Sequence, residues 1–196
     1  MSEDGANKSR RRFLTGAVSV VGGVGVAYTA VPFLSYWNPS ARTRAAGAPV
    51  EVDTSTMQPG QKINLTWRGQ PVWVIRRSEA ALETLPELND RLRDPDSTVA
   101  SQQPSYAQNI YRSIDPEFLV LVPICTHLGC IPSYMPQPGS LDTNWPGGLF
   151  CPCHGSRFDM AGRVYAGVPA PTNLVVPPYR VADNGLIVVG EDEEAA

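Results

Sequence analysis

The chain has 196 residues, and its composition is ordinary for a folded protein except for 19 prolines and 17 glycines. That bias favours short strands joined by tight turns. The formal net charge of -3 hides an asymmetry: residues 1–44 hold six basic and two acidic side chains, a balance of +4, so the remainder carries -7. A basic leader on an acidic body argues against nucleic acid as a partner.

Residues 13–37 contain no charged side chain. As an α-helix this run would extend for about 37 Å, which exceeds the roughly 30 Å hydrocarbon core of a bilayer. The sequence therefore predicts one transmembrane anchor over 13–37, preceded by a basic, unstructured cytoplasmic leader over 1–12. We expect a single-pass protein of the cell inner membrane, with its C-terminal body in the periplasm.

Residues 9–14 read Ser-Arg-Arg-Arg-Phe-Leu, immediately before the apolar run. This order resembles a twin-arginine export signal, which is read by a receptor that exports folded proteins. An ordinary basic flank of a membrane helix is the alternative. Ala46-Gly47-Ala48 has the form of a cleavage site, but the apolar run is longer than that of a cleaved signal, so we expect the anchor to be retained.

Residues 38–49 are small and polar and predict a flexible hinge linker ahead of a body over 50–196. In the body, alternating apolar residues predict hairpins around residues 68–70 and 183–185. One soluble helix is predicted over 78–93, with Thr84 and Glu87 as a candidate capping box; residues 94–114 are polar and irregular. The strands predicted in this mainly β body are 61–67, 71–76, 117–124, 174–176, 179–182 and 186–189.

All four cysteines and both histidines lie within residues 125–154. They form two short loops, Cys-Thr-His-Leu-Gly-Cys over 125–130 and Cys-Pro-Cys-His-Gly-Ser over 151–156. Each loop offers one histidine and two cysteines, and the second loop ends in a serine. This concentration of metal-binding side chains is the feature on which the functional prediction depends.

Three kinds of site are compatible with these residues. Two structural disulfides would suit an exported protein but leave both histidines without a role. A tetrahedral zinc site with two cysteines and two histidines fits the ligand set, and spacing alone does not exclude it, but two cysteines remain unexplained. A 2Fe–2S cluster held by two cysteines and two histidines is the third, and it is the one we favour.

Both loops match the pattern of the Rieske iron–sulfur family, C-x-H-x-G-C followed by C-x-C-H-G-S. Gly162-Arg163 and residues 167–174 also resemble the segment that follows in that family. The resemblance implies an antiparallel β-sandwich with a cluster-binding subdomain over about 123–172. It also implies that Cys125 and Cys151 bind one iron of a single 2Fe–2S cluster, His127 and His154 the other, and that Cys130 and Cys153 form a disulfide. Ser156 is implied as a further cofactor-binding residue.

The chain is similar to subunits of the cytochrome bc complexes of respiring bacteria. This likeness implies a one-electron carrier that is one subunit, and not the whole, of a quinol–cytochrome c oxidoreductase. The implied partners are cytochrome b, a membrane-bound c-type cytochrome and a quinol that hydrogen-bonds to His154, in a dimeric complex. We expect Leu128 and the loop over 169–171 to provide apolar docking surface, although a core role for Leu128 is an alternative. The rival function is the small Rieske subunit of a periplasmic oxidase such as arsenite oxidase.

Phe158 departs from the family pattern. Many members have Tyr two residues after the serine of the second loop, where its hydroxyl donates a hydrogen bond to a ligand sulfur. Hydrogen bonds to cluster sulfurs stabilise the more negative, reduced state. The sequence therefore predicts a lower reduction potential than in relatives that have Tyr.

Overall fold

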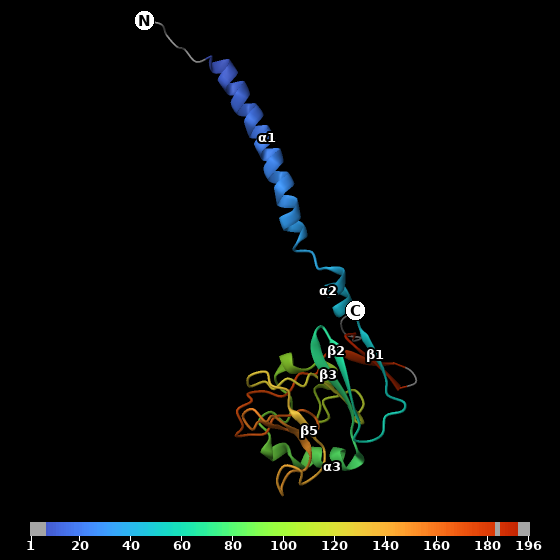
Figure 1. The fold of residues 1–196 in the computed structure, drawn as a ribbon. Helices are drawn as coiled ribbons and strands as arrows, with labels where there is room; N and C mark the ends of the chain where they lie inside the picture. The colour runs from blue at the N-terminus through green and yellow to red at the C-terminus, as the bar shows by residue number, and fades with distance from the viewer. Residues whose placement is uncertain (1–6, 183–184, 192–196) are drawn as a thin grey trace. The chain divides into compact units, whose positions relative to one another are not determined.

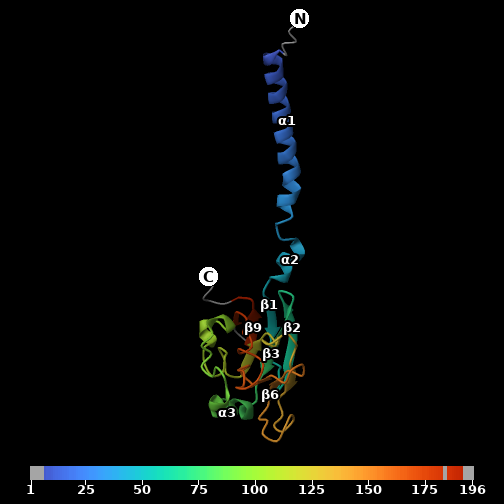
Figure 2. The ribbon, with the colours of Figure 1, turned by 90° about the vertical axis from the view of Figure 1, so that its left-hand side faces the viewer.

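The computed structural model describes residues 7–182 and 185–191 (Figures 1 and 2). The chain divides into an N-terminal unit that ends at Ala45 and a body that begins at Ala46. The N-terminal unit is helical, and the body is built mainly from antiparallel strands. This architecture confirms the prediction of a mainly β body preceded by one long apolar helix.

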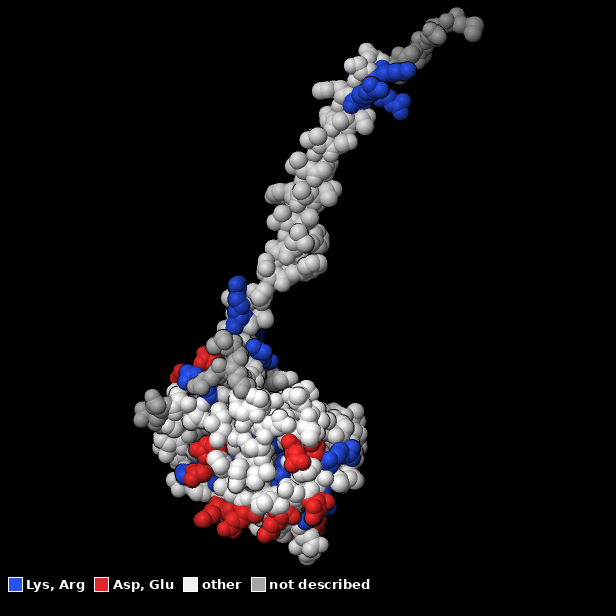
Figure 3. Space-filling model, turned by 180° about the vertical axis from the view of Figure 1, so that it is seen from behind, with Lys and Arg blue, Asp and Glu red and all other residues white. Residues whose placement is uncertain are grey.

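Helix α1 spans Lys8–Ser35, so it begins five residues before the predicted span. Asn7 caps it, because its side-chain oxygen accepts hydrogen bonds from the backbone N–H groups of Ser9 and Arg10. The prediction that residues 8–12 are unstructured is therefore wrong, and the basic side chains occupy the first turns of α1 (Figure 3). By length and composition α1 is a candidate membrane span.

Helix α2, Ala41–Ala46, lies in the segment predicted to be an irregular linker. Ser40 starts it: the Ser40 hydroxyl accepts a hydrogen bond from Thr43 N–H at 3.1 Å, and the Ser40 carbonyl accepts one from Arg44 N–H at 3.0 Å. A serine cap followed by alanines and arginines favours a helix even where apolar residues show no helical period.

The body contains three antiparallel sheets of three strands each among the described residues. Their strand orders are β1-β9-β8, β2-β3-β4 and β5-β6-β7. The hairpin predicted around Arg68-Gly69 is confirmed, with both residues at positive φ in a two-residue turn between Trp67 and Gln70. The strands are β1 Val50–Asp53, β2 Lys62–Trp67, β3 Gln70–Arg76, β4 Phe118–Leu121, β5 Ser133–Met135, β6 Gly148–Phe150, β7 Arg157–Phe158, β8 Tyr179–Ala182 and β9 Leu186–Val189.

The pairing of β8 with β9 confirms the second predicted hairpin, although Asp183 and Asn184 of its turn lie outside the described residues. The predicted strand over 117–124 is confirmed over β4. The one predicted over 174–176 is reduced to an isolated bridge between Val122 and Val175.

Strand β3 lies between two hydrophobic cores, and its successive side chains point alternately into one and the other. Val72 and Val74 pack with β1, β8 and β9 in one core, whereas Trp73 and Ile75 pack with β6, β7 and the cysteine loops in the other. Successive side chains of a strand point to opposite faces of its sheet, so a strand buried on both faces serves two cores at once. The sheet β2-β3-β4 thus packs against the cysteine–histidine loops on one face and against the sheet β1-β9-β8 on the other.

Helix α3, Glu79–Glu87, is shorter than the predicted helix and ends in a 3-10 turn, η1, over Asn89–Arg91. Its N-cap is Ser78, whose hydroxyl accepts a hydrogen bond from Ala81 N–H. The predicted capping box is wrong, because Thr84 lies inside the helix and donates its hydroxyl to the Ala81 carbonyl. Leu85 buries one face of α3, and the exposed glutamates on the other contribute to the acidic surface in Figure 3.

Residues 94–114 contain two further 3-10 turns, η2 over Ala100–Gln102 and η3 over Ser105–Ala107. This segment was predicted to be irregular, and it holds neither an α-helix nor a strand. It nevertheless contributes buried side chains, including Ala107 and Arg112.

Candidate metal centre

The two cysteine–histidine loops share one backbone design. In the first loop, Cys125 N–H donates to the Cys130 carbonyl at 2.8 Å and Gly129 N–H donates to the Cys125 carbonyl at 2.9 Å. In the second, Cys151 N–H donates to the Ser156 carbonyl at 2.8 Å and Gly155 N–H donates to the Cys151 carbonyl at 2.9 Å. Each six-residue loop is therefore closed at the same two positions.

Glycine is required at the fifth position of each loop. Gly129 has φ 85° and Gly155 has φ 75°, a backbone conformation that side chains with a Cβ disfavour. The first loop follows strand β4 closely, and the second connects β6 to β7. The sheets thereby hold both loops at their ends and position the side chains between them.

The four cysteines fall into two kinds. Cys130 and Cys153 form the disulfide that the family resemblance implied, and it joins the two loops. Cys125 and Cys151 are free thiols with only 2% and 1% of their surface exposed. The sulfurs of Cys130, Cys151 and Cys153 lie within 4.8 Å of one another, but two of them are bonded together, so these three residues are not a set of metal ligands.

The free thiols of Cys125 and Cys151 lie side by side in the hydrophobic core. Burial raises the pKa of the Cys125 thiol, and the neighbouring Cys151 acts in the same direction. Hydrogen bonds to the Cys125 sulfur from the His127 backbone N–H and the Ser156 hydroxyl lower that pKa. Such a buried thiol needs a compensating positive charge to become a thiolate, and a metal ion provides one.

The two histidine rings also lie close together, edge to face. Their centroids are 4.7 Å apart and the rings are nearly perpendicular, at 89°. Nδ1 of His127 is buried and has no hydrogen-bond partner among the described residues. A buried nitrogen without a partner is costly unless something binds it, so the orphaned atom fits a metal ligand. His154, in contrast, is exposed.

The two buried thiols therefore lie together, the two imidazoles lie together, and the disulfide joins the loops that carry them. This donor set fits a 2Fe–2S centre with one iron on sulfur ligands and the other on nitrogen ligands. The structure brings together every residue that the sequence selected for the site: Cys125, His127, Cys130, Cys151, Cys153, His154 and Ser156.

A proline-rich segment closes over the loops, and both loops hold it. The Ser156 hydroxyl accepts a hydrogen bond from Ala170 N–H at 3.0 Å, and the Thr126 hydroxyl donates to the Thr172 carbonyl at 2.8 Å. Ala170 is fully buried, while Pro169 and Pro171 on either side are exposed. Sequence reasoning missed the role of Thr126, although a threonine between two metal-binding side chains was a usable signal.

The tip of the first loop is apolar and exposed. Leu128 has 71% of its surface exposed and Ile131 has 55%. The alternative core role for Leu128 is therefore wrong, because no core residue keeps so much of its surface in solvent. Exposed apolar side chains next to a site indicate a contact surface.

Phe158 is fully buried and packs in the same core as Cys125 and Cys151. It lies on β7, opposite Leu149 of β6. The ring carries no hydrogen-bond donor, so this position contributes packing to the cysteine sulfurs without a polar contact.

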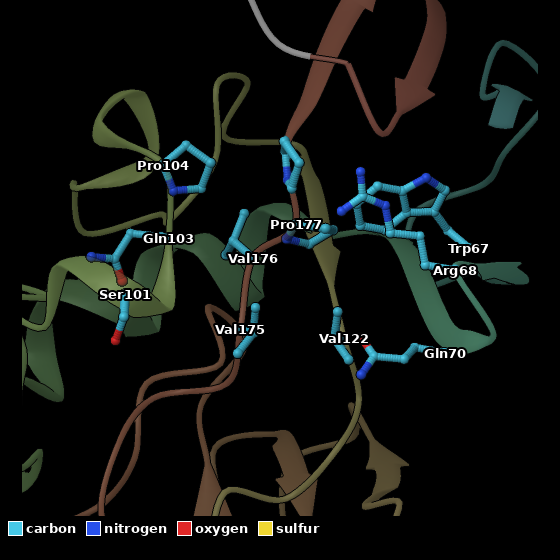
Figure 4. Close-up of a pocket in the computed structure, with 11 residues that line it drawn as sticks. Trp67, Arg68, Gln70, Ser101, Gln103, Pro104, Val122, Val175, Val176 and Pro177 are labelled. Carbon is cyan, nitrogen blue, oxygen red and sulfur yellow. The ribbon is translucent and has the colours of Figure 1, made fainter. Parts of the chain in front are cut away.

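A pocket of about 490 Å³ lies elsewhere on the body (Figure 4). Trp67 and Arg68 line one side of it, and Gln103 and Pro104 line the other. None of the residues that line it belongs to either cysteine–histidine loop. The chemistry of the site resides at the loops and not in this pocket.

Comparison with known protein families decides among the three kinds of site. Residues 49–180 match the model of the Rieske [2Fe-2S] domain. The chain belongs to the Rieske iron–sulfur family. Its cofactor is therefore a 2Fe–2S cluster, and the interpretations as zinc site or as two structural disulfides are wrong. Residues 1–40 match a model described as the twin-arginine signal of the ubiquinol–cytochrome c reductase Fe–S subunit, which confirms the predicted export signal.

Individual relatives extend the Rieske match over the whole chain. The ubiquinol–cytochrome c reductase iron–sulfur subunit of Allochromatium vinosum is 54% identical over 198 residues, covering 100% of this chain and 95% of that protein. The subunit of the same name from Blastochloris viridis is 44% identical, covering 96% of this chain and 97% of that protein. Among solved structures, a chain of a hyperthermophilic respiratory Complex III covers 89% of this chain and 98% of its own length at 27% identity, with a TM-score of 0.49.

Proposed function

We propose that this chain is the electron-carrying iron–sulfur subunit of a ubiquinol–cytochrome c reductase. Relatives of that name match it from end to end. The observation that carries the proposal is the exposed His154 ring, which contacts the His127 ring in loops whose two free thiols are buried, because it gives a redox centre one ligand that a substrate can reach. An oxidase subunit of the arsenite oxidase type is not favoured by these relatives.

Cys125 and Cys151 would hold one iron, and His127 and His154 would hold the other. The bound cluster supplies a one-electron acceptor whose potential is raised by histidine ligation. The buried side of the centre, with the two thiols and Nδ1 of His127, excludes water from the ligands. The disulfide between Cys130 and Cys153 keeps the two loops together on the outer side.

His154 would contact the quinol. An imidazole has two ring nitrogens, so one can bind metal while the other accepts a hydrogen bond from a quinol hydroxyl and then takes up its proton. A quinol must release protons together with electrons. An exposed imidazole ligand therefore suits this substrate better than a fourth thiolate would.

The exposed apolar tip would dock into the partner that binds the quinol. Leu128 and Ile131 offer side chains that are costly to leave in water, and Pro169 and Pro171 extend the same kind of surface on a segment that both loops hold in place. By analogy with the relatives, that partner is cytochrome b, and a membrane-bound c-type cytochrome receives the electron. The complete complex is then a dimer.

The N-terminal helix would anchor the chain in the inner membrane as a single span that is not cleaved. The basic residues at the start of α1 favour a cytoplasmic N-terminus and a periplasmic body over 50–196. The segment over 38–49 would act as the hinge on which the body moves between cytochrome b and the c-type cytochrome. Because α2 makes part of this segment helical, the hinge residues would lie on either side of α2.

Electron paramagnetic resonance of the purified complex tests the proposal. The reduced complex should give the signal of a 2Fe–2S cluster, that signal should change when a quinone-site inhibitor is added, and haem b should co-purify. A signal that ignores the inhibitor, in a preparation without haem b, would overturn the assignment to a quinol-oxidising complex.

The hinge has its own test. Deleting residues 41–46 should slow electron delivery to the c-type cytochrome while the cluster signal stays unchanged. Unchanged turnover would remove the hinge from the account without affecting the cluster.

A further inference from the structure

Three arginine side chains are buried in the protein, which is unusual for this residue type. Arg77 has 2% of its surface exposed, and Arg112 and Arg163 have none. They come from different parts of the chain: Arg77 follows β3, Arg112 precedes β4, and Arg163 lies beyond β7. Their guanidinium groups nevertheless all donate hydrogen bonds to residues of the same turn, over 159–163.

This turn begins directly after β7, three residues after the second cysteine loop ends. Arg77 donates to the carbonyl of Met160 at 3.2 Å, and Arg112 donates to that of Ala161 at 3.3 Å. Arg163 pairs with Asp159, with 2.7 Å between Nε and Oδ2. The turn is therefore surrounded by three guanidinium groups.

Asp159 is the single buried acid among the residues that the structure describes. Among the fully buried side chains, three guanidiniums and one carboxylate leave an excess of two positive charges, while the half-buried Asp94 and Asp115 oppose part of it. Burial lowers the pKa of Arg77 and of Arg112 to about 10. The Asp159 carboxylate acts against burial on both, Asp115 does so on Arg77 and Asp94 on Arg112, so the two side chains stay protonated at neutral pH.

Backbone carbonyl groups solvate these charges without cancelling them. Arg77 donates to three carbonyl groups, those of Tyr111, Pro116 and Met160, and otherwise to a serine hydroxyl. A carbonyl dipole stabilises a nearby cation, but its field falls off faster with distance than that of a charge. At the distance of a neighbouring site, the positive excess of the buried side chains is felt most, because water screens the half-buried Asp94 and Asp115 more strongly.

The cluster site is such a neighbour. Met160 and Ala161 of the turn pack in the same hydrophobic core as Cys125 and Cys151. Charges separated by a dry core interact more strongly than they would through water. A 2Fe–2S centre gains one negative charge when it is reduced, so positive charge below it favours the reduced form.

We propose that the excess positive charge of Arg77, Arg112 and Arg163 over Asp159 raises the reduction potential of the cluster held by the neighbouring loops. The guanidinium groups oppose the effect of Phe158, which offers the cysteine sulfurs no hydrogen-bond donor. The inference rests on the cluster and not on the quinol or on any partner protein.

The test is a redox titration of the cluster signal in the purified full chain, without partners. Arg112→Gln removes one buried charge and should lower the midpoint potential, whereas Arg112→Lys keeps the charge and should leave the potential close to that of the unaltered chain. Asp159→Asn removes the opposing charge and should raise the potential. Arg180→Gln, at a side chain that is 37% exposed, is the matched surface control and should change nothing.

Iron content per chain and circular dichroism identify variants that fail to fold. A fully loaded Arg112→Gln chain with an unchanged potential overturns the proposal, and so does an Arg112→Lys chain whose potential falls as far as that of Arg112→Gln. If Arg112→Gln loses its cluster, Arg77→Gln and Arg77→Lys repeat the comparison. Loss of the cluster from both Gln variants assigns the arginines to folding alone and likewise overturns the proposal.

Discussion

The two cysteine–histidine loops have the same backbone hydrogen bonds but carry different side chains. Both begin with a buried cysteine and have a glycine at positive φ in fifth place, and matching hydrogen bonds close both. Their other four residues differ, and the third, fourth and sixth carry the functional side chains. The first loop has His127, Leu128 and Cys130 at these places, and the second has Cys153, His154 and Ser156.

This difference separates two tasks that one metal centre must perform. The shared positions bury Cys125 and Cys151 and fix the geometry of the site. The unshared positions place the exposed apolar Leu128 on one loop and the exposed imidazole of His154 on the other. A partner protein can then pack against the first, and a substrate can hydrogen-bond to the second. The same loop backbone with different side chains therefore gives a metal centre whose cysteine ligands are buried and whose His154 ligand is exposed to solvent.

The largest expected effect tests the shared positions. Cys125→Ser and Cys151→Ser should each abolish the cluster completely, because each removes a buried thiol at the equivalent position of its loop and a serine hydroxyl does not replace a thiolate at iron. Iron analysis and the resonance signal of the reduced chain measure this. Ser133→Ala, at an exposed serine of β5, is the control. A variant that retained a normal cluster would break the equivalence of the two loops.

The next effect concerns the bond between the loops. The Cys130–Cys153 disulfide joins residues that are 23 apart, and a link of that length stabilises a chain by about 3 kcal/mol. The double variant Cys130→Ser, Cys153→Ser should lower the free energy of unfolding by about that amount, as measured by urea titration of the full chain in detergent. Unaltered chain treated with a reductant should unfold at the same urea concentration as the variant. Equal stability with and without the bond would show that the loops hold each other by packing alone.

The exposed tip of the first loop gives a smaller effect, confined to partner binding. Leu128→Ala should leave the cluster signal unchanged but lower turnover of the assembled complex about tenfold, since burying a leucine side chain is worth about 1.5–3 kcal/mol. Steady-state kinetics and denaturation of the same preparation separate docking from stability. Wild-type turnover would mean that Leu128 is exposed without a partner to cover it.

The smallest effect concerns Phe158 on β7, the strand that directly follows the second loop. Phe158→Tyr restores a hydroxyl beside the cysteine sulfurs, and a hydrogen bond of about 1.5 kcal/mol to the reduced centre corresponds to a rise in midpoint potential of about 60 mV. Redox titration of the full chain measures it. Phe158→Leu keeps the site apolar and should not raise the potential. Failure of the potential to rise in the Tyr variant would remove the argument based on Phe158.

Much of the site could be predicted from the sequence because metal-binding side chains are rare in this chain and lie together. Apolar residues also identified strands β3 and β4. The segment over 117–124 is a strongly apolar run because β4 is buried on both faces and its side chains serve two cores. Local patterns failed where a cap decided the outcome, as with Asn7 at the start of α1 and Ser40 at the start of α2. They also gave no sign of the buried arginines, because the carbonyl groups that solvate Arg77 and Arg112 come from distant parts of the chain.

The exposure of individual side chains was equally out of reach of the sequence. Nothing in the order of residues distinguishes the buried Nδ1 of His127 from the exposed ring of His154, because tertiary packing alone sets that difference. The same holds for Leu128, for which a core position and a surface position were both compatible with the sequence.

The histidine ligands of the cluster can be tested directly, because the sequence contains only two histidines. Labelling histidine with ¹⁵N and recording pulsed electron paramagnetic resonance of the reduced full chain reports only His127 and His154. Two distinct nitrogen couplings that change on labelling are expected, and substitution of either histidine should remove the signal. A spectrum identical in labelled and unlabelled protein would contradict the account, since neither imidazole would then bind the iron.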